Sequence, residues 1–180
     1  MRVTYSRELI IKAELDRLKI ENFLPMVYTV VDVDTDNPHR ELVPAINNLI
    51  FVRSSRSYLS ELKSTNAVLQ PLRYMMDHTA DRSRTIMTVP DAQMENFMRV
   101  ASIKDDSVMP LEYNDFIAKK GKRVRIIDGM FGGVEGTIKR IKKQKHVVVQ
   151  IEGIAAIAIT FVPPSFLEII NDNPEMTLKG

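Results

Sequence analysis

The sequence RVRIIDGMFGGVEGTIKRI, residues 123–141, decides the fold of the second half of the chain. Two segments rich in β-branched residues flank a loop whose glycines stand at positions 129, 132, 133 and 136. Glycine adopts a positive φ without a steric penalty and allows another backbone segment to approach closely. Strand-forming residues return at positions 146–151. The pattern predicts a tightly turned corner of a small β-barrel.

A phosphate-binding loop is the alternative interpretation of this glycine-rich segment. The spacing argues against it, because it contains neither a GxGxxG leading into a helix nor a GxxxxGK followed by Ser or Thr. We therefore favour the barrel corner over a nucleotide site.

Length and composition limit the class of protein. With 180 residues, 44% of them hydrophobic, the chain can form one medium domain or two small ones with a real core. It has no cysteine, which excludes a disulfide scaffold, and its three histidines do not stand at metal-ligand spacing. The N-terminus lacks a signal-peptide pattern, and the longest apolar run, 154–162, is too short to span a bilayer. We expect a cytoplasmic protein, monomeric and not bound to a membrane.

The net charge of +2 is distributed unevenly along the chain. The first 100 residues hold 13 basic and 13 acidic residues, whereas positions 119–146 hold ten basic and two acidic ones. This excess indicates an acidic partner, either nucleic acid or protein. A solvated hairpin tip at 142–145 explains the same charges equally well.

No arrangement of residues indicates catalysis. The sequence contains no nucleophile elbow, no HExxH and no Walker motif. Asp32, Asp34 and Asp36 alternate as in a divalent-ion cluster, but the glycine and distal glutamate of an EF-hand are missing, so we predict a solvated loop. We predict a binding protein without catalytic residues, metal or cofactor.

The first part of the chain predicts the element order β-α-β-β-α-β-α, an α+β sandwich in which helices pack on a sheet. Helices are expected after Ser6, after Ser57 and from Asp91, where apolar residues recur at helical spacing. The predicted boundaries are a first domain at 1–101, a linker at 102–118, a barrel at 119–172 and a tail at 173–180.

The glycine-rich stretch resembles the KOW motif, which opens the small SH3-like barrel of NusG-type transcription elongation factors and of some ribosomal proteins. Gly129, Phe131, Gly133 and Gly136 carry this resemblance. The first domain is also similar to the NusG family, at 20–25 and at 43–52. The best match is to its specialised antiterminator branch, the UpxY-like paralogues of capsular polysaccharide operons. The implied fold is a NusG-type αβ sandwich followed by an SH3-like KOW barrel.

The resemblance implies a transcription elongation or antitermination factor. The first domain would grip the clamp helices of the largest RNA polymerase subunit through an apolar depression, and the barrel would recruit a second partner. The matching positions for the polymerase contact are Tyr5, Ile46, Asn48, Leu49 and Phe51. For Ile46 and Leu49 ordinary core packing is the alternative.

The barrel partner would contact Ile151, Glu152 and Gly153. Glu152 stands where the family has a hydrophobic contact to the ribosomal protein NusE or to Rho, so the resemblance does not predict either protein as the partner.

Nucleic-acid contacts are a further expectation, with non-template DNA or nascent RNA as the ligand. In the first domain the resemblance points to Arg53, Arg56, Thr65 and Asn66. A polar helix end is the simpler interpretation of this segment. In the barrel the candidates are Lys139, Arg140, Lys142, Lys143 and Lys145. A ribosome-associated or RNA-binding KOW protein is therefore the alternative function.

Overall fold

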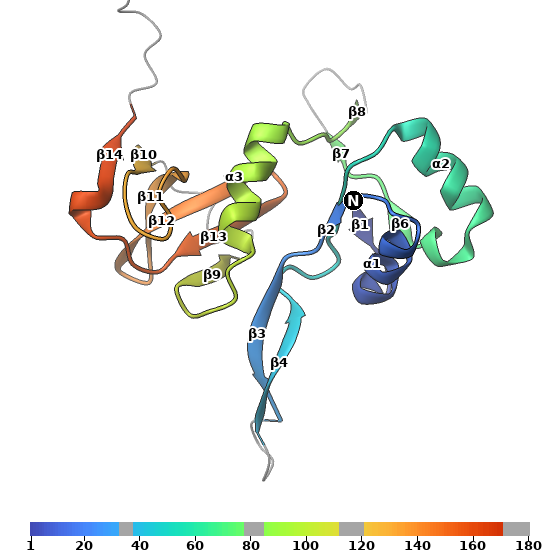
Figure 1. Ribbon diagram of the computed structural model, residues 1–180, viewed down its shortest axis with the longest axis horizontal. Coiled ribbons are helices and arrows are strands. Elements are labelled where there is room, and N and C mark those ends of the chain that lie inside the picture. Colours follow the sequence, from blue (N-terminus) through green and yellow to red (C-terminus); the bar gives the residue numbers. More distant parts are fainter. Residues whose placement is uncertain (33–37, 78–84, 112–120, 171–180) are drawn as a thin grey trace, which may run out of the picture. The chain divides into compact units, whose positions relative to one another are not determined.

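The computed structural model describes residues 1–32, 38–77, 85–111 and 121–170. The chain is a mixed α/β protein that divides into two compact units, Met1–Val89 and Pro90–Gly180 (Figure 1). Of the sequence predictions, Asp34 and Asp36, residues 112–118 of the linker and the tail lie outside the described residues.

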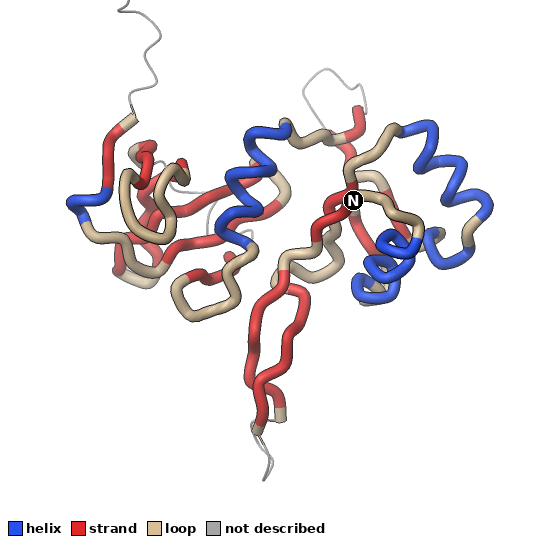
Figure 2. The backbone as a smooth tube through the Cα atoms, in the orientation of Figure 1, coloured by secondary structure: helices blue, strands red, loops and turns tan. Residues whose placement is uncertain are grey.

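The first unit holds two α-helices at the places that the apolar periodicity predicts (Figure 2). They are α1 (Glu8–Arg17) and α2 (Arg56–Thr65), followed by the short 3-10 helix η1 (Ala67–Leu69). The predicted caps differ by one or two residues. Ser55 rather than Ser57 caps α2, because its hydroxyl accepts a hydrogen bond from the Tyr58 amide at 3.3 Å. The cap of α1 is Arg7 rather than Ser6, and its side chain makes no capping bond.

The strands of the first unit pair two by two, whereas the sequence predicts one sheet. The pairs are β1 (Arg2–Val3) with β6 (Leu72–Arg73), β2 (Asn22–Phe23) with β5 (Phe51–Val52), β3 (Met26–Val31) with β4 (His39–Pro44), and β7 (Met76–Asp77) with β8 (Thr85–Ile86). The β3–β4 hairpin extends away from the rest of this unit (Figure 1). Its second strand starts at His39, whereas the polar composition of residues 32–40 predicts a loop there.

The core of the first unit forms where α1 packs against these strands. Val3, Ile11, Leu15, Ile50 and Leu72 are almost fully buried in it. Ile11 and Leu15 are one helical turn apart, so they face the core together.

The second unit is built on a six-stranded antiparallel sheet in the order β14-β10-β11-β12-β13-β9. The strands are β9 (Val108–Leu111), β10 (Arg123–Ile126), β11 (Glu135–Ile141), β12 (Gln144–Ile151), β13 (Ala155–Ile159) and β14 (Leu167–Ile169), with the 3-10 helix η2 (Pro164–Phe166) before the last. The strands predicted on either side of the glycine loop are present as β10, β11 and β12. No pair among the described strands closes this sheet into a barrel, so the SH3-like barrel stays a prediction.

Glycine is required in the corner for two different structural reasons. Gly129 and Gly133 have φ values of +78° and +83°, which favour glycine. Gly136 lies against β12, where an added Cβ would stand 2.7 Å from Val147 Cγ1 and 2.8 Å from the Val148 carbonyl oxygen. The loop can therefore turn sharply and still pack closely on the neighbouring strand.

Helix α3 (Asp91–Ala101) belongs to the second unit, although the sequence places it at the end of the first domain. It contacts β12 and β13, and Phe97 and Val100 are fully buried. The Asn96 side chain donates to the Glu135 carbonyl at 2.7 Å and accepts from the Glu135 amide at 3.0 Å. Strand β9 likewise pairs with β13, although the sequence predicts linker there. The limits of independently folding domains stay a prediction.

No helix in the described ranges is long and apolar enough to cross a membrane.

We predict that Asn96→Ala lowers the free energy of unfolding of the second unit by about 1 to 3 kcal/mol, because both hydrogen bonds to the Glu135 backbone are lost. Urea unfolding followed by circular dichroism and hydrogen exchange at the Glu135 amide measure the effect. Glu95→Ala, which removes an exposed side chain of the same helix, is the control. Equal effects of the two substitutions would contradict the assigned role of Asn96.

Candidate functional site

Strand β1 holds the candidate polymerase-binding residues of the first unit together. It lies between β6 and the segment 48–50: Arg2 is opposite Arg73 on one side and bridges to Leu49 on the other. Backbone hydrogen bonds fix this register, from the Val3 amide to the Asn48 carbonyl at 3.0 Å and from the Ile50 amide to the Met1 carbonyl at 3.1 Å. Residues 46 to 51 are thereby brought close to the N-terminal segment.

Side chains alternate between the two faces of these strands. Ile50 packs in the core of the first unit and Val52 against it, so Leu49 and Phe51 point to the opposite side. Phe51 is paired with Phe23 across β2 and β5. Because cross-strand partners point to the same side, this side carries a set of residues that we call the outer face: Arg2, Phe23, Leu49, Phe51 and Arg73.

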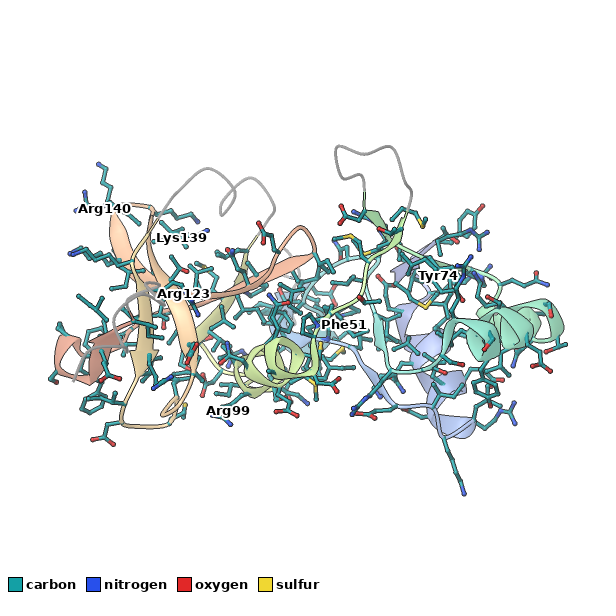
Figure 3. All side chains as sticks on the ribbon, turned by 90° about the horizontal axis from the view of Figure 1, so that it is seen from above. Phe51, Tyr74, Arg99, Arg123, Lys139 and Arg140 are labelled. Carbon is teal, nitrogen blue, oxygen red and sulfur yellow. The ribbon has the colours of Figure 1, made fainter. Side chains whose placement is uncertain are left out.

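Leu49 and Phe51 are buried, at 4% and 8% exposed, respectively, and are not members of the cluster around Ile11, Leu15 and Ile50. A polymerase contact requires these two side chains at the surface, whereas in this conformation both are packed. Figure 3 labels Phe51. Ile46 is half-buried in the turn before Leu49. Asn48 ends that turn with a φ of +60°, a value that asparagine tolerates better than most residues.

Tyr5 is the most exposed large hydrophobic side chain among the described residues, at 83%. Tyr5 and Ser6 have φ values of +66° and +49°, respectively, which is unusual for two consecutive residues that are not glycine. The Arg7 guanidinium lies 5.8 Å from the centre of the Tyr5 ring. Strained backbone that presents an exposed aromatic ring is typical of functional segments.

A buried carboxylate joins the Tyr5 segment to the Asn48 turn. Glu8, 4% exposed, accepts a hydrogen bond from the Asn48 amide at 2.5 Å. Tyr5 and Asn48, which are 43 positions apart in the sequence, therefore lie in one region of the first unit. Leu49 and Phe51 follow Asn48 directly along the chain.

The N-terminal amine is part of the same region. The Met1 ammonium donates to the Ile50 carbonyl at 2.7 Å. Burial, and secondly the neighbouring charge of Arg2, lower the pKa of this amine from 8.0 to about 6.

The candidate nucleic-acid contacts of the first unit already interact with other residues of that unit. Arg53 lies 3.6 Å from the Glu21 carboxylate, and Asn66 donates to Glu14 at 2.5 Å. The Thr65 hydroxyl donates to the Glu61 carbonyl at 3.1 Å, which fits a polar helix end. Arg56, at the start of α2, accepts through its carbonyl from the Tyr74 hydroxyl at 3.3 Å.

Four of the basic residues predicted to contact nucleic acid in the second unit are exposed or partly exposed, at the turn between β11 and β12: Arg140, Lys142, Lys143 and Lys145. Lys139 differs. It is 6% exposed, its ammonium donates to Gln150 Oε1 at 3.0 Å, and burial lowers its pKa. Figure 3 labels Lys139 and Arg140. A buried ammonium bound to the neighbouring strand is not available to a phosphate in this conformation.

The predicted partner contact at the end of β12 has one exposed charge. Ile151 is buried, Glu152 is exposed, and Gly153 has a φ of +68° in the turn to β13. Of the three residues, Glu152 and Gly153 are exposed and Glu152 alone carries a charge.

Three residues of the outer face are absent from the predicted site, namely Arg2, Phe23 and Arg73. Arg2 and Arg73 come together only through the pairing of β1 with β6, between segments 71 residues apart. No local pattern in the sequence signals that pairing, since each strand is two residues long.

We predict that the free energy of unfolding rises between pH 6 and pH 8, by up to about 2 to 3 kcal/mol from the Met1 amine. In this range the unfolded chain binds more protons than the folded chain, so raising the pH favours folding. Urea unfolding across the range measures the slope. N-terminal acetylation, which removes the charge and keeps an N–H donor, is expected to flatten it; an unchanged slope would contradict the burial of the amine.

The comparisons with known proteins give a coarse likeness in structure alone. No protein-family model matches the chain, and no curated protein matches it in sequence. Among solved structures, the chain is similar to one described as "Domain interaction in Thermotoga maritima NusG", with 17% identity and a TM-score of 0.42, over 95% of this chain and 94% of that one. At this level of similarity the function has to be argued from the residues of the chain itself.

Proposed function

We propose that this protein is a cytoplasmic transcription elongation or antitermination factor of the NusG type, related to the specialised UpxY-like paralogues. Its first unit binds the clamp helices of the largest RNA polymerase subunit, and its second unit, an SH3-like KOW domain, recruits another protein. It acts by binding and has no catalytic role.

One observation carries the polymerase contact: residues 49–52 divide between two faces. Ile50 and Val52 serve the core of the first unit, while Leu49 and Phe51 point to the outer face. A sheet with apolar side chains on both faces needs a layer on each face, and in this structure Leu49 and Phe51 are already covered. A pair of helices from a partner would replace that cover, with most of the binding energy in a few buried anchors.

Because Leu49 and Phe51 are buried in this structure, docking has to expose them. The apparent affinity for the polymerase then depends on the fraction of molecules in which Leu49 and Phe51 are exposed. The bound factor favours one conformation of the polymerase to the extent that it binds this conformation more tightly than the alternative.

An RNA-binding role is the second candidate, and the turn between β11 and β12 favours it. Lys142 and Lys143 have φ values of +46° and +71°, respectively, in a two-residue hairpin turn that asparagine and glycine fill with less strain. Lys142 and Lys143 keep this backbone strain, and Arg140 and Lys145 lie beside them. Strain that is retained at a cluster of positive charges favours a binding role for those charges.

We predict that the double variant Ile46→Asp, Leu49→Asp binds purified RNA polymerase at least about tenfold more weakly, since two carboxylates cannot be covered by an apolar partner. Leu9→Asp with Ile10→Asp is the matched control, because it adds the same charges at exposed apolar positions of α1. A pull-down and a titration measure the binding, and circular dichroism checks the fold. If the double variant unfolds, Ile46→Asp alone replaces it, because Ile46 is only half-buried. Unchanged affinity of a folded variant would remove the proposed surface.

For the second candidate, RNA affinity is expected to fall steeply with salt. The triple variant Lys142→Gln, Lys143→Gln, Lys145→Gln then reduces the slope of log K against log salt by about 2 to 3, since each lost phosphate contact removes about 0.7 to 0.9. Titration of a labelled single-stranded RNA measures it. RNA binding that is unaffected by these changes would exclude the turn as the contact.

A further inference from the structure

The β3–β4 hairpin carries an apolar stripe along one of its two faces. Cross-strand partners point to the same face, so Tyr28 lies beside Leu42 and Val30 beside Arg40. We call these four side chains the hairpin face. Met26, two positions before Tyr28, shares this face and packs against the core of the first unit. The apolar stripe therefore starts at the core and continues outward along β3.

The outer part of this stripe is open to solvent. Tyr28 and Val30 are 44% and 50% exposed, respectively, and Leu42 is half-buried. Among the described strands, β3 and β4 pair only with each other, and the hairpin extends away from the rest of the first unit (Figure 2). A two-stranded hairpin on its own is marginally stable in water, and a layer packed on its apolar face stabilises it. The hairpin face is therefore a surface that gains from being covered by a partner.

The opposite face of the hairpin has a different composition. Its exposed residues are Thr29, His39 and Glu41, and its three valines are half-buried: Val27, Val31 and Val43. Exposed apolar side chains of β3 and β4 thus occur on the hairpin face alone. Of the two faces, the hairpin face is the one that removes exposed apolar surface from water when a partner docks.

The charge of the hairpin decides which class of partner fits. In the sequence, residues 26–44 hold four acidic residues and one basic residue, Arg40, a net charge of −3, whereas the whole chain carries +2. Of the acidic residues, the structure describes Asp32 and Glu41, and both are exposed. This charge repels the phosphates of a nucleic acid, the headgroups of an anionic membrane and the same hairpin of a second copy. It attracts a protein surface that carries basic residues.

We propose that the hairpin face binds an apolar protein surface that is bordered by basic side chains. Tyr28 and Val30 are the anchors, because tyrosine covers a large area at a low cost in side-chain entropy and the branched valine side chain is already stiff. The acidic residues of the hairpin act at longer range: they speed the association and exclude acidic partners. This inference goes beyond the proposed function, because it uses no residue of the polymerase contact.

Docking on the hairpin face also stabilises the pairing of β3 with β4. A hairpin without a third strand opens at a low cost in free energy, so its amide hydrogens exchange rapidly with solvent. A partner that covers Tyr28 and Val30 slows this exchange, whereas a partner bound elsewhere leaves it unchanged. Protection of the hairpin amides therefore reports where a probe binds.

The test uses the full chain and three fluorescein-labelled probes: a helical peptide with a leucine stripe flanked by lysines, the same peptide with glutamates in place of the lysines, and a single-stranded DNA. Anisotropy is measured at low and at physiological ionic strength. We expect the lysine peptide to bind at least about tenfold more tightly than the glutamate peptide, with an affinity that falls with salt. Hydrogen exchange of β3 and β4 is expected to slow when the lysine peptide binds.

Tyr28→Ser with Val30→Ser is expected to weaken binding of the lysine peptide at least about tenfold, since both apolar anchors are lost. The matched control is Thr29→Ser with Val31→Ser, which shortens two side chains of the same strand on the opposite face and is expected to leave binding unchanged. Equal losses in the two double variants would overturn the inference. DNA binding that is lost in Tyr28→Ser with Val30→Ser would also overturn it and would assign the hairpin to nucleic acid.

If the variant at the hairpin face opens the hairpin, Asp32→Asn with Glu41→Gln replaces it. Asparagine tolerates the φ of +56° at position 32, and glutamine keeps the length of the Glu41 side chain. This variant is expected to bind the lysine peptide more weakly and with a smaller dependence on salt. An unchanged affinity together with an unchanged salt dependence would overturn the inference.

The polymerase variant separates this inference from the proposed function. Ile46→Asp with Leu49→Asp is expected to keep its full affinity for the lysine peptide, whether or not it binds polymerase. A loss of peptide binding in that variant, with the fold retained by circular dichroism, would place the peptide on the polymerase contact and overturn the inference.

Discussion

The first unit depends on one constraint, the register of strand β1 between β6 and residues 48–50. Backbone hydrogen bonds from Val3 and Ile50, together with the Met1 amine, fix that register. A slip by one residue would exchange the two faces of the strand. Arg2 would then enter the apolar core and Val3 would leave it, so the buried core and the outer face are specified together.

In the second unit the corresponding constraint is the tight approach between the glycine corner and its neighbours. Gly136 allows β12 to lie close to β11, and the Glu135 backbone is held by Asn96 of α3. The Glu135 carboxylate in turn accepts hydrogen bonds from Arg125 at 2.7 and 3.1 Å, which raises the pKa of that guanidinium. One residue thus links the helix, the corner and a strand of basic residues.

Helix positions and the β10–β12 strands could be predicted from the sequence because they depend on local periodicity and on glycine. The apolar spacing of Met94, Phe97 and Ala101 correctly predicts a helix with one buried side. It does not specify which unit buries that side, and the sequence boundary at residue 101 therefore differs from the compact units. The sequence does not predict strand β4, because His39 and Arg40 are typical of a polar loop and only their pairing with Val31 and Val30 makes them strand.

The candidate site likewise combines features that the sequence predicts with features that only the structure decides. The sequence alone determines that the chain has no cysteine, that strand-forming segments flank a glycine corner, and that positions 119–146 hold an excess of positive charge. Only the tertiary structure decided that Leu49 and Phe51 are packed, that Lys139 is buried against Gln150, and that Arg2 faces Arg73. The physical reason is that periodicity and turn chemistry act over a few residues, whereas burial and cross-strand neighbours are set by pairings between segments as far apart as residues 2 and 73.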